Sequence, residues 1–503
     1  MEKFMDAKVS GPAVAAPAAP LPPRPAVAPL THREKRLVVI SMMLPIFLGS
    51  VDQSILATSL PTIGRDLGDV HNLPWLITAF LISATALTPL YGKFADIHGR
   101  RITLLIALAI YMTGALISAS SSSMMMLICG RVVQGCGGGG LNTSATMILG
   151  DIAAPRDRAR YYAYFSAAFT TAGACGPALG GWICEHLRWQ MIFLWNVPLC
   201  LIAAGLALTV LRRLPRYDRP HRLDVAGALL IMAASSAFML ALNLGGVRYP
   251  WLSVPILGLT AAAALIGTAF VVRLLTAAEP LIPIAILADP AARLCIAANG
   301  FGWGAIIGLN IFLPMYLQSI LGWSPTASGL SLMILMVTLN SSAGLSSQLI
   351  GRVRHYKLLP SLCLMLGIAA VLALAYAAND MTSLKFEILL FLIGAGFGPM
   401  PPLTQVALQN TVAARHLGSA IGTMNFSRTL LGTVTVAVFG AIVLAGVPLG
   451  SAAALGESVL SGASVVRFSA VFVCAAAALA VALAAILLLE EKPLQATMPD
   501  PDS

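Results

Sequence analysis

The sequence predicts an all-α integral membrane protein with about fourteen membrane-spanning helices. Hydrophobic residues make up 58% of its 503 residues and charged residues only 10%, and its mean hydropathy is +0.85. A soluble chain carries about 25% charged residues. No soluble core could bury so much apolar surface, so the composition excludes a soluble protein.

The predicted spans follow from length, because an apolar stretch of roughly 20 residues crosses a bilayer as a helix. In the first half of the chain they lie near 37–58, 74–92, 102–120, 124–149, 162–184, 190–211, 225–244 and 252–272. In the second half they lie near 292–318, 326–350, 358–378, 387–410, 417–444 and 466–489.

Basic residues alternate between the loops as the positive-inside rule describes. If the N-terminal tail is cytoplasmic, every second loop is also cytoplasmic and holds most of the loop arginines and lysines. These are Lys93, Arg100, Arg101, Arg156, Arg158, Arg160, Arg212, Arg213, Arg216, Arg219, Arg222, Arg273, Arg293, Arg352, Arg354, Lys357 and Arg415. The sequence therefore predicts a multi-pass protein of the cell (inner) membrane with both termini cytoplasmic. The net charge of +10 reflects this topology and contact with membrane lipids rather than a nucleic-acid patch.

The order of the spans predicts two bundles with an insertion between them. We expect a Pro/Ala-rich disordered cytoplasmic tail over 1–34, a six-helix bundle over 35–214, a linker with two extra helices over 215–285, a second six-helix bundle over 286–492 and a tail over 493–503. A short basic turn follows the second helix of each bundle, "GKFADIHGRR" in the first and "GRVRHYK" in the second, although the second lacks the aspartate. Transporters built from repeats bind substrate between the two halves.

Several motifs in the first bundle carry a family resemblance. They are "VDQSILATSLPTIGRDLG", "GKFADIHGRR", "RVVQGCGGGG" and "GPALGG", in this order along the chain. The chain resembles a proton-coupled exporter of the major facilitator superfamily, in its fourteen-helix drug:proton antiporter branch. The resemblance implies two pseudo-symmetric six-helix bundles plus two inserted helices, and multidrug efflux by alternating access. We expect a monomer.

The stretch "TTAGACGPALGGW" interrupts an apolar span with helix-breaking residues. Gly173, Gly176, Pro177 and Gly180 recur at helical spacing, with Gly181 beside them. Small residues on one face let a neighbouring helix approach closely, and a proline bends the helix. We expect a tight, bent seam that seals the outer half of the pathway. The resemblance adds a role in making exchange directional. The alternative is ordinary close packing.

The loop "GKFADIHGRR" is predicted to be a cytoplasmic gating contact. Asp96 can pair with an arginine or with the positive N-terminus of a neighbouring helix. Gly92 and Gly99 permit the turn, while Arg100 and Arg101 reach lipid headgroups. The alternative is an anchor that fixes topology without gating.

Ionisable residues inside a membrane are functional hypotheses by default. Asp52 lies about 22 Å from the cytoplasmic edge of a core about 30 Å thick, and Arg131 roughly 10 Å below the outer edge. The two therefore lie at similar depth. Low dielectric disfavours a carboxylate, and an approaching arginine favours it. We expect Asp52 to carry the coupling proton and Arg131 to modulate it, unless the two form a static ion pair.

A third buried charge, Arg428, is predicted near the middle of the bilayer. With one core carboxylate against two arginines, the cavity should not favour dications, so neutral or anionic amphiphiles, or monocations at most, fit better. The predicted cavity residues are Gln53, Gln134, Trp195, Asn196, Asn310, Tyr316, Asn425 and Arg428, with Gln318, Asn340, Gln405 and Trp303 as further contributors. For each amide, bonding across helices is the competing interpretation.

Together these features predict proton-coupled antiport that exports small hydrophobic or amphiphilic compounds. The alternatives are a dedicated exporter of one metabolite (a siderophore, lipid or antibiotic) and a non-transporting sensor on the same fold. The sequence has no Gly-x-x-x-x-Gly-Lys phosphate loop and no His/Cys ligand spacing, so we expect neither an enzyme nor a metal site. We expect no cofactor other than the proton as coupling ion.

Overall fold

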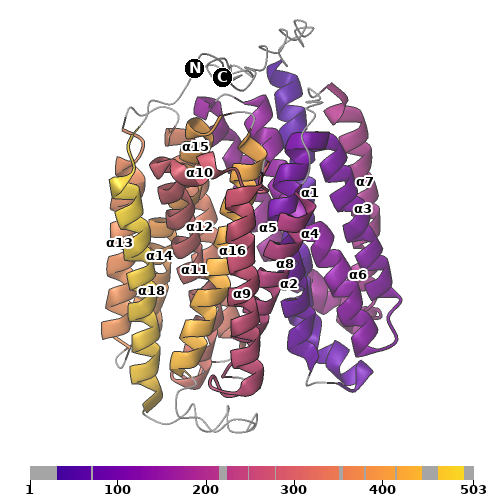
Figure 1. Ribbon diagram of the computed structural model, residues 1–503. Coiled ribbons are helices and arrows are strands. Elements are labelled where there is room, and N and C mark those ends of the chain that lie inside the picture. Colours follow the sequence, from indigo (N-terminus) through magenta and orange to yellow (C-terminus); the bar gives the residue numbers. More distant parts are fainter. Residues whose placement is uncertain are drawn as a thin grey trace, which may run out of the picture.

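A computed structural model describes residues 31–491, except 70–71, 154, 214–223, 247, 278, 324, 351–354, 379–380, 414–415 and 444–462. The described residues are helical and run up and down about one axis (Figure 1). We name two faces by the helices that end there. The upper face is where the first helix begins at His32 and the last ends at Leu488, and the lower face is the opposite one.

The first group of helices spans 32–213. It contains α1 (His32–Leu67), α2 (Leu73–His98), α3 (Arg100–Ala119), α4 (Met124–Ile152), α5 (Pro155–His186), α6 (Met191–Leu194) and α7 (Asn196–Val210), followed by the short 3-10 helix η2 (Leu211–Arg213). Trp195 keeps helical backbone angles between α6 and α7, so these two form one continuous span.

Most of the predicted tail 1–34 lies outside the described residues, but its last residues are helical. The Thr31 side chain accepts from the Glu34 N–H at 3.3 Å, and the Glu34 carboxylate accepts from the Thr31 N–H at 2.9 Å. This reciprocal capping box starts α1 at His32. The predicted tail 493–503 lies wholly outside the described residues.

Two helices, α8 (Val225–Leu244) and α9 (Val254–Thr276), are inserted between the groups. Asp224 caps α8 through the Gly227 N–H at 3.0 Å and pairs with Arg273 near the end of α9 at 3.0 Å. α8 packs against α2 and α16, whereas α9 packs mainly on α8. The apolar side chains of α9 are otherwise largely exposed, as expected for a helix that faces lipid.

The second group begins with the short α10 (Ile284–Ala288), so the predicted boundary at 285/286 falls inside this helix. The longer helices are α11 (Pro290–Ser319), α12 (Pro325–Ile350), α13 (Leu358–Tyr376), α14 (Ser383–Phe397), α15 (Met400–Thr411), α16 (Leu417–Val443) and α18 (Ala463–Leu488). α14 and α15 together form one apolar span from Ser383 to Thr411.

The two groups repeat the same pattern of helix pairs. In the first, α1 packs on α5, α2 on α4, α3 on α4, and α7 on both α1 and α3. In the second, α11 packs on α16, α12 on α14, α13 on α14, and α18 on both α11 and α13. The contacts between groups also match, since α2 meets α16 and α5 meets α12. The groups are thus related by pseudo-symmetry, and we call them the first and second bundle.

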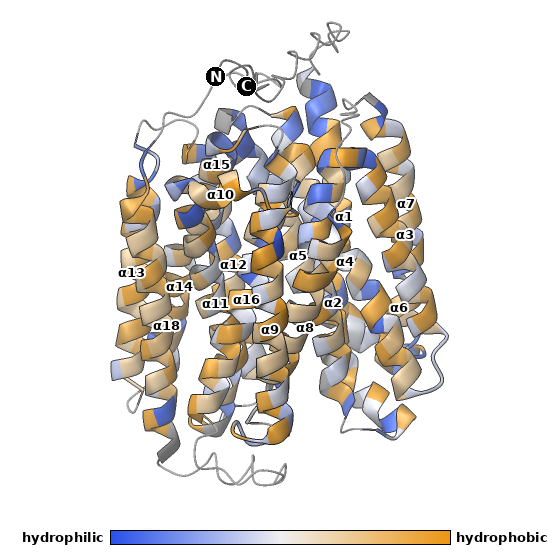
Figure 2. Cartoon of the chain, in the orientation of Figure 1, coloured by the Kyte–Doolittle hydropathy of each residue, from blue (hydrophilic) through white to orange (hydrophobic). Residues whose placement is uncertain are grey.

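Hydropathy agrees with a membrane location. Figure 2 shows apolar residues along the lengths of the helices and hydrophilic residues gathered toward the upper face. Among the described residues, 12 helices are long and apolar enough to cross a membrane. α4 and α5, at 29 and 32 residues, are long enough but are not among these twelve. The predicted all-α membrane fold is confirmed, while the count of fourteen spans stays a prediction.

The glycines of α4 allow close packing with its neighbouring helices. A side-chain carbon at Gly137 would collide with the backbone of Tyr111 on α3, and one at Gly139 would collide with the Ala84 carbonyl on α2. The glycines therefore let α2 and α3 pack directly against the backbone of α4. Arg131 lies about two turns earlier on the same helix.

Candidate functional site

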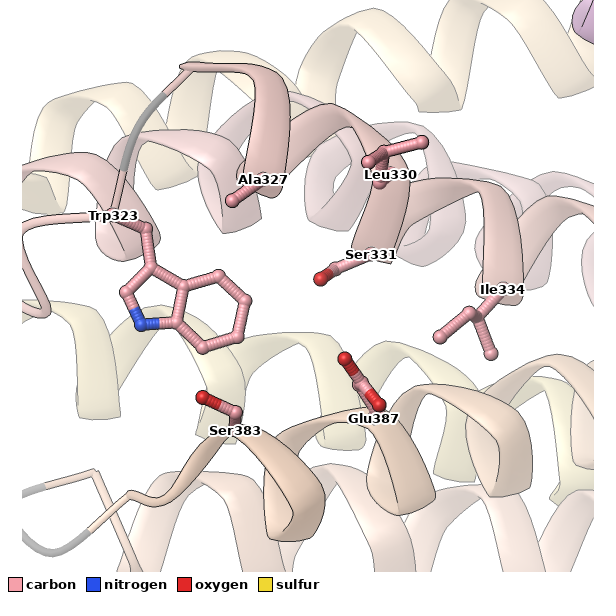
Figure 3. A pocket seen from close by; sticks show the side chains of 7 residues that line it. All are labelled: Trp323, Ala327, Leu330, Ser331, Ile334, Ser383 and Glu387. Carbon is pink, nitrogen blue, oxygen red and sulfur yellow. The ribbon is translucent and has the colours of Figure 1, made fainter.

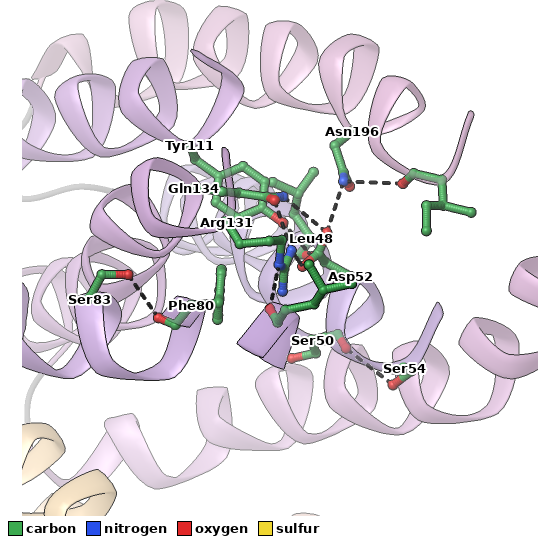
Figure 4. Close-up of polar contacts among 12 residues, drawn as sticks. Leu48, Ser50, Asp52, Ser54, Phe80, Ser83, Tyr111, Arg131, Gln134 and Asn196 are labelled. Carbon is green, nitrogen blue, oxygen red and sulfur yellow. Dashed lines mark hydrogen bonds and ion pairs between the residues drawn. The ribbon is translucent and has the colours of Figure 1, made fainter. Parts of the chain in front are cut away.

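Asp52 of α1 and Arg131 of α4 form a buried ion pair. The Arg131 Nη1 atom lies 2.6 Å from Asp52 Oδ2, and the two residues are 0% and 3% exposed. Figure 4 shows the pair inside the first bundle, with amide side chains from α4 and α7 turned toward the carboxylate. The sequence predicted that these two residues lie at the same depth, and the structure brings them into direct contact.

Both members of the pair have further hydrogen-bond partners. Asp52 Oδ1 accepts from Gln134 Nε2 at 3.0 Å and from Asn196 Nδ2 at 3.1 Å. Arg131 donates through Nε to the Leu76 carbonyl at 3.0 Å and through Nη1 to Gln134 Oε1 at 2.8 Å. A buried charge is tolerated when it is paired and hydrogen-bonded in this way. The network holds α1, α2, α4 and α7 together in one arrangement.

A separate cavity of about 490 Å³ lies between the two bundles. α1, α2, α4 and α5 line it on one side, and α11, α12, α15 and α16 on the other. Asp52 is not part of its wall, although its neighbours on α1, Ser50 and Gln53, are. One turn of α1 therefore presents the carboxylate to the interior of the first bundle and polar side chains to the cavity.

Most of the cavity surface is apolar, although nearly half of the residues that line it have polar side chains. Arg428 is the only residue with a formal charge among the described residues that line it. Its guanidinium carbon lies 5.1 Å from the centre of the Trp303 ring. Amide groups of Asn299 and Asn425 reach the same cavity. Such a combination suits a small organic molecule with an apolar body.

The structure bears on the predicted cavity residues individually. Gln53, Asn425 and Arg428 line the cavity, as do the further contributors Asn340, Gln405 and Trp303. Gln134 and Asn196 do not, because the Asp52 carboxylate orients both amides into the first bundle.

Trp195, Asn310 and Tyr316 also lie away from the cavity wall. Asn310 donates to the Ile306 carbonyl of its own helix at 2.9 Å. Tyr316 is fully buried within the second bundle, where its hydroxyl donates to the Ala378 carbonyl at 2.7 Å. Trp195 packs beside a separate apolar cluster in the first bundle. These three residues do not line this cavity, because depth alone does not say which way a side chain faces.

Asp96 connects the two bundles at the upper face. Its Oδ2 atom accepts from the Ser419 N–H and hydroxyl, each at 2.9 Å, and its Oδ1 atom accepts from the Gly418 N–H at 3.1 Å. These donors form the N-terminus of α16, where a carboxylate is favoured. Arg100 Nη1 lies 2.6 Å from Asp96 Oδ1, so the predicted arginine and the predicted helix end both contact this aspartate.

The other residues of this motif have different surroundings. A side-chain carbon at Gly92 would lie 2.5 Å from the Gly418 carbonyl, so the glycine permits close contact between α2 and α16. Gly99 has φ +89°, which suits glycine at the turn into α3. Arg100 also pairs with Asp151 of α4 at 2.9 Å, a partner that the sequence did not reveal. Arg101 is bonded to the Leu208 carbonyl of α7, within the first bundle.

Arg158 makes a second connection at the upper face. This residue is 1% exposed and donates to the carbonyls of Gly150 at 2.6 Å, Ala153 at 2.8 Å and Gln409 at 3.1 Å. Gln409 belongs to α15, and its amide donates to the Tyr162 hydroxyl of α5 at 2.9 Å. The sequence indicated only a topological charge here.

Only part of the predicted glycine seam of α5 makes a close contact with a neighbouring helix. Gly176 is buried, and a side-chain carbon there would collide with Ser54 of α1. Gly180 is also buried, but Gly173 lines the cavity and neither Gly173 nor Gly181 has a neighbour within 4 Å of such a carbon. The side chain of Pro177 lies outside the described residues. Among the glycines of the motif whose surroundings the structure describes, the close approach is between Gly176 of α5 and Ser54 of α1, within one bundle.

A further cavity of about 520 Å³ lies toward the lower face, between α12 and the start of α14. Figure 3 shows Trp323, Ser331 and Glu387 around it. It is confined to the second bundle and shares no lining residue with the cavity between the bundles. Among the described residues, no group of three or more His, Cys, Asp or Glu is arranged to hold a metal ion.

Comparison with known proteins identifies the family of this arrangement. Residues 42–437 match the Major Facilitator Superfamily. The chain belongs to the major facilitator superfamily. The two pseudo-symmetric bundles are therefore those of the major facilitator fold.

Relatives with curated names include efflux proteins. The Multidrug transporter protein MdtP of Bacillus subtilis is 29% identical over 412 residues, which is 81% of this chain and 75% of the relative. An uncharacterized MFS-type transporter of Mycobacterium tuberculosis is 29% identical over 413 residues, which is 82% of this chain. The match spans only 60% of that longer protein.

Solved structures of two other proteins share the fold of this chain. The human organic anion transporter MFSD10 superposes with a TM-score of 0.62 at 17% identity, covering 88% of this chain and 99% of that one. The proton:xylose symporter XylE superposes with a TM-score of 0.58 at 14% identity, covering 89% and 95%. At these identities the likeness extends to the fold alone.

Proposed function

We propose that this transporter is a proton-coupled antiporter that exports small hydrophobic or amphiphilic compounds from the cell by alternating access. The names of the relatives at 29% identity support efflux. The basic residues at the upper face support a cytoplasmic location for that face in the cell (inner) membrane. One chain supplies both walls of the cavity, so a monomer suffices.

The coupling proposal rests on α1, which faces the interior of the first bundle on one side and the cavity on the other. Asp52 contacts Arg131 inside the first bundle, while Gln53 and Ser50 line the cavity. Protonation of Asp52 removes the negative charge that holds the Arg131 guanidinium. α1 then loses its strongest attachment to α4, and the cavity wall that α1 forms can shift. Proton binding and substrate binding thereby act on the same helix from opposite sides.

The contacts at the upper face support a gating cycle. Asp96 bonded to the N-terminus of α16, and Arg158 bonded to α15, join the bundles on the cytoplasmic side. This arrangement fits an outward-facing state. Breaking these contacts would let the bundles separate at that side and admit substrate from the cytoplasm.

Proton movement in inside-out vesicles tests the proposal. Purified protein is reconstituted with an acidic lumen and a trapped pH dye, and ethidium, Hoechst 33342 or pyrenebutyrate is added outside. At least one compound should raise the luminal pH through the wild type, because export into the lumen releases protons outward. Asp52→Asn should abolish this response while retaining some passive exchange of the compound. Glu387→Gln, which removes a carboxylate outside the cavity between the bundles, should respond as the wild type.

Proton release that persists in Asp52→Asn would contradict the assignment of the coupling residue. If no compound in a broad panel moved through the wild type, multidrug export would be wrong. Response to one metabolite of the host alone would instead identify a dedicated exporter.

A further inference from the structure

The charge of the cavity is unbalanced. Arg428 is half-buried in its wall, and no carboxylate among the described residues pairs with it. The negative charge of Asp52 is already matched by Arg131 inside the first bundle. The cavity wall therefore carries one net positive charge among its described residues. An unpaired charge away from bulk water is costly, and a bound anion would compensate it.

An aromatic surface lies beside this charge. The Arg428 guanidinium lies over the Trp303 ring, with the carbon 5.1 Å from the ring centre. The cation–π contact holds the side chain without consuming its charge or its in-plane N–H donors. Phe169 and Ile307 line the same cavity. A ligand with an acidic group and a flat apolar body would match both features.

A second buried polar atom also lacks a partner. Asn299 lies one helical turn before Trp303 on α11 and is 3% exposed. Its Nδ2 atom donates to Thr404 Oγ1 at 3.0 Å, which leaves the Oδ1 atom as an acceptor without a donor in the described part of the chain. Buried polar atoms are normally satisfied. Asn299 lines the cavity, but this oxygen is itself fully buried, so the amide does not present it to the cavity.

We propose that the cavity is built for an anionic amphiphile, whose carboxylate or sulfonate binds Arg428 and whose aromatic body packs on Trp303. This inference rests on the proposed function, because it names the substrate class of the cavity that export would use. It narrows the sequence-based expectation, which left neutral, anionic and singly charged cationic compounds open.

Binding to the purified full-length chain tests the substrate class without any proton gradient. The probes are pyrenebutyrate, pyrenebutanol and pyrenebutylamine, which share one aromatic body and differ in charge. Fluorescence polarisation should give the tightest binding for pyrenebutyrate. Arg428→Gln should weaken pyrenebutyrate about tenfold or more, because it removes a charge-assisted hydrogen bond. The same variant should leave pyrenebutanol unchanged and should improve pyrenebutylamine.

Two further variants separate local charge from general effects. Arg428→Lys keeps the charge and should retain part of the pyrenebutyrate affinity, with a loss smaller than that of Arg428→Gln. Arg248→Gln removes an exposed arginine between α8 and α9 and should bind all three probes as the wild type does. Folding of each variant is checked by its elution as a single species in detergent and by pyrenebutanol binding.

The outcomes distinguish this inference from the function on which it rests. Wild-type protein that binds pyrenebutyrate no more tightly than pyrenebutanol, or Arg428→Gln protein that binds it unchanged, would overturn the anion site. Binding of pyrenebutyrate that depends on Arg428, together with no proton-coupled movement in vesicles, would support the site and refute antiport.

Discussion

The Asp96 carboxylate accepts hydrogen bonds from both the backbone N–H and the hydroxyl of Ser419, each at 2.9 Å. Asp96 lies in the last turn of α2 in the first bundle, and Ser419 lies in the first turn of α16 in the second. One side chain thus supplies the cap of a helix that belongs to the opposite half of the molecule.

This cap predicts a change in accessibility at the upper face. Asp96→Asn keeps the shape of the side chain but loses the charge that favours the helix N-terminus, a loss of about 1 kcal/mol or more. The bundles should then separate more often on that side. A cysteine introduced at Asn142 in a background without native cysteines should react faster with a maleimide added from the cytoplasmic side. Asp96→Glu is the control that keeps the charge, and equal labelling rates in all three proteins would argue against a gating contact.

The buried ion pair predicts strong non-additivity in stability. Arg131→Gln leaves the Asp52 carboxylate without its cation and should destabilise the protein by about 3–5 kcal/mol if the carboxylate stays charged. Asp52→Asn leaves the arginine without its anion and should also destabilise. The double variant removes both charges and should recover much of the loss. Thermal unfolding in detergent measures all four proteins, and additive effects would show that the pair is not coupled.

The packing of α5 predicts different tolerance at two glycines of one motif. Gly176→Ala places a carbon against Ser54 of α1 and should cost about 1–3 kcal/mol by overpacking. Gly181→Ala meets nothing within 4 Å and should leave thermal stability nearly unchanged. Similar melting temperatures for the two variants would contradict the close contact between α1 and α5.

The contacts of Arg158 predict that lysine cannot replace arginine at this position. The planar guanidinium donates to three backbone carbonyls, two in its own bundle and one on α15. Arg158→Lys keeps the charge but cannot reproduce this fork. We expect slower proton-coupled transport and faster labelling at the upper face in the lysine variant. Arg160→Lys, at an exposed position nearby, is the matched control and should resemble the wild type.

The sequence predicted well wherever the membrane restricts the options. Few charged side chains are tolerated inside the membrane, so Asp52 and Arg131 are expected to pair with each other. Their charged groups lie 2.6 Å apart. It predicted less well for neutral polar residues. Asn196 and Asn310 both fit a cavity by depth, but one bonds Asp52 and the other bonds its own helix. The rotation of each helix about its own axis decides which partner an amide meets. In helices that are apolar on most faces, the sequence gives little indication of that rotation.

Helix ends and surface arginines show a second limit. The apolar stretch of the first span ends near 58, yet α1 continues to Leu67 because a helix need not stop at the edge of the bilayer. Arg158 looked like a loop cation that marks topology, but it is buried between the bundles. Sequence alone does not distinguish an arginine that faces lipid headgroups from one that bonds carbonyls across an interface.

The inserted helix α8 makes the two lateral sides of the molecule unequal. It packs over the line where α2 meets α16, whereas neither α8 nor α9 packs closely over the equivalent line where α5 meets α12 in the described part of the chain. Compounds dissolved in the hydrocarbon layer would therefore find one flank shielded and the other exposed. A sideways route from the bilayer leaflet into the central chamber, if the carrier uses one, has to run past α5 and α12.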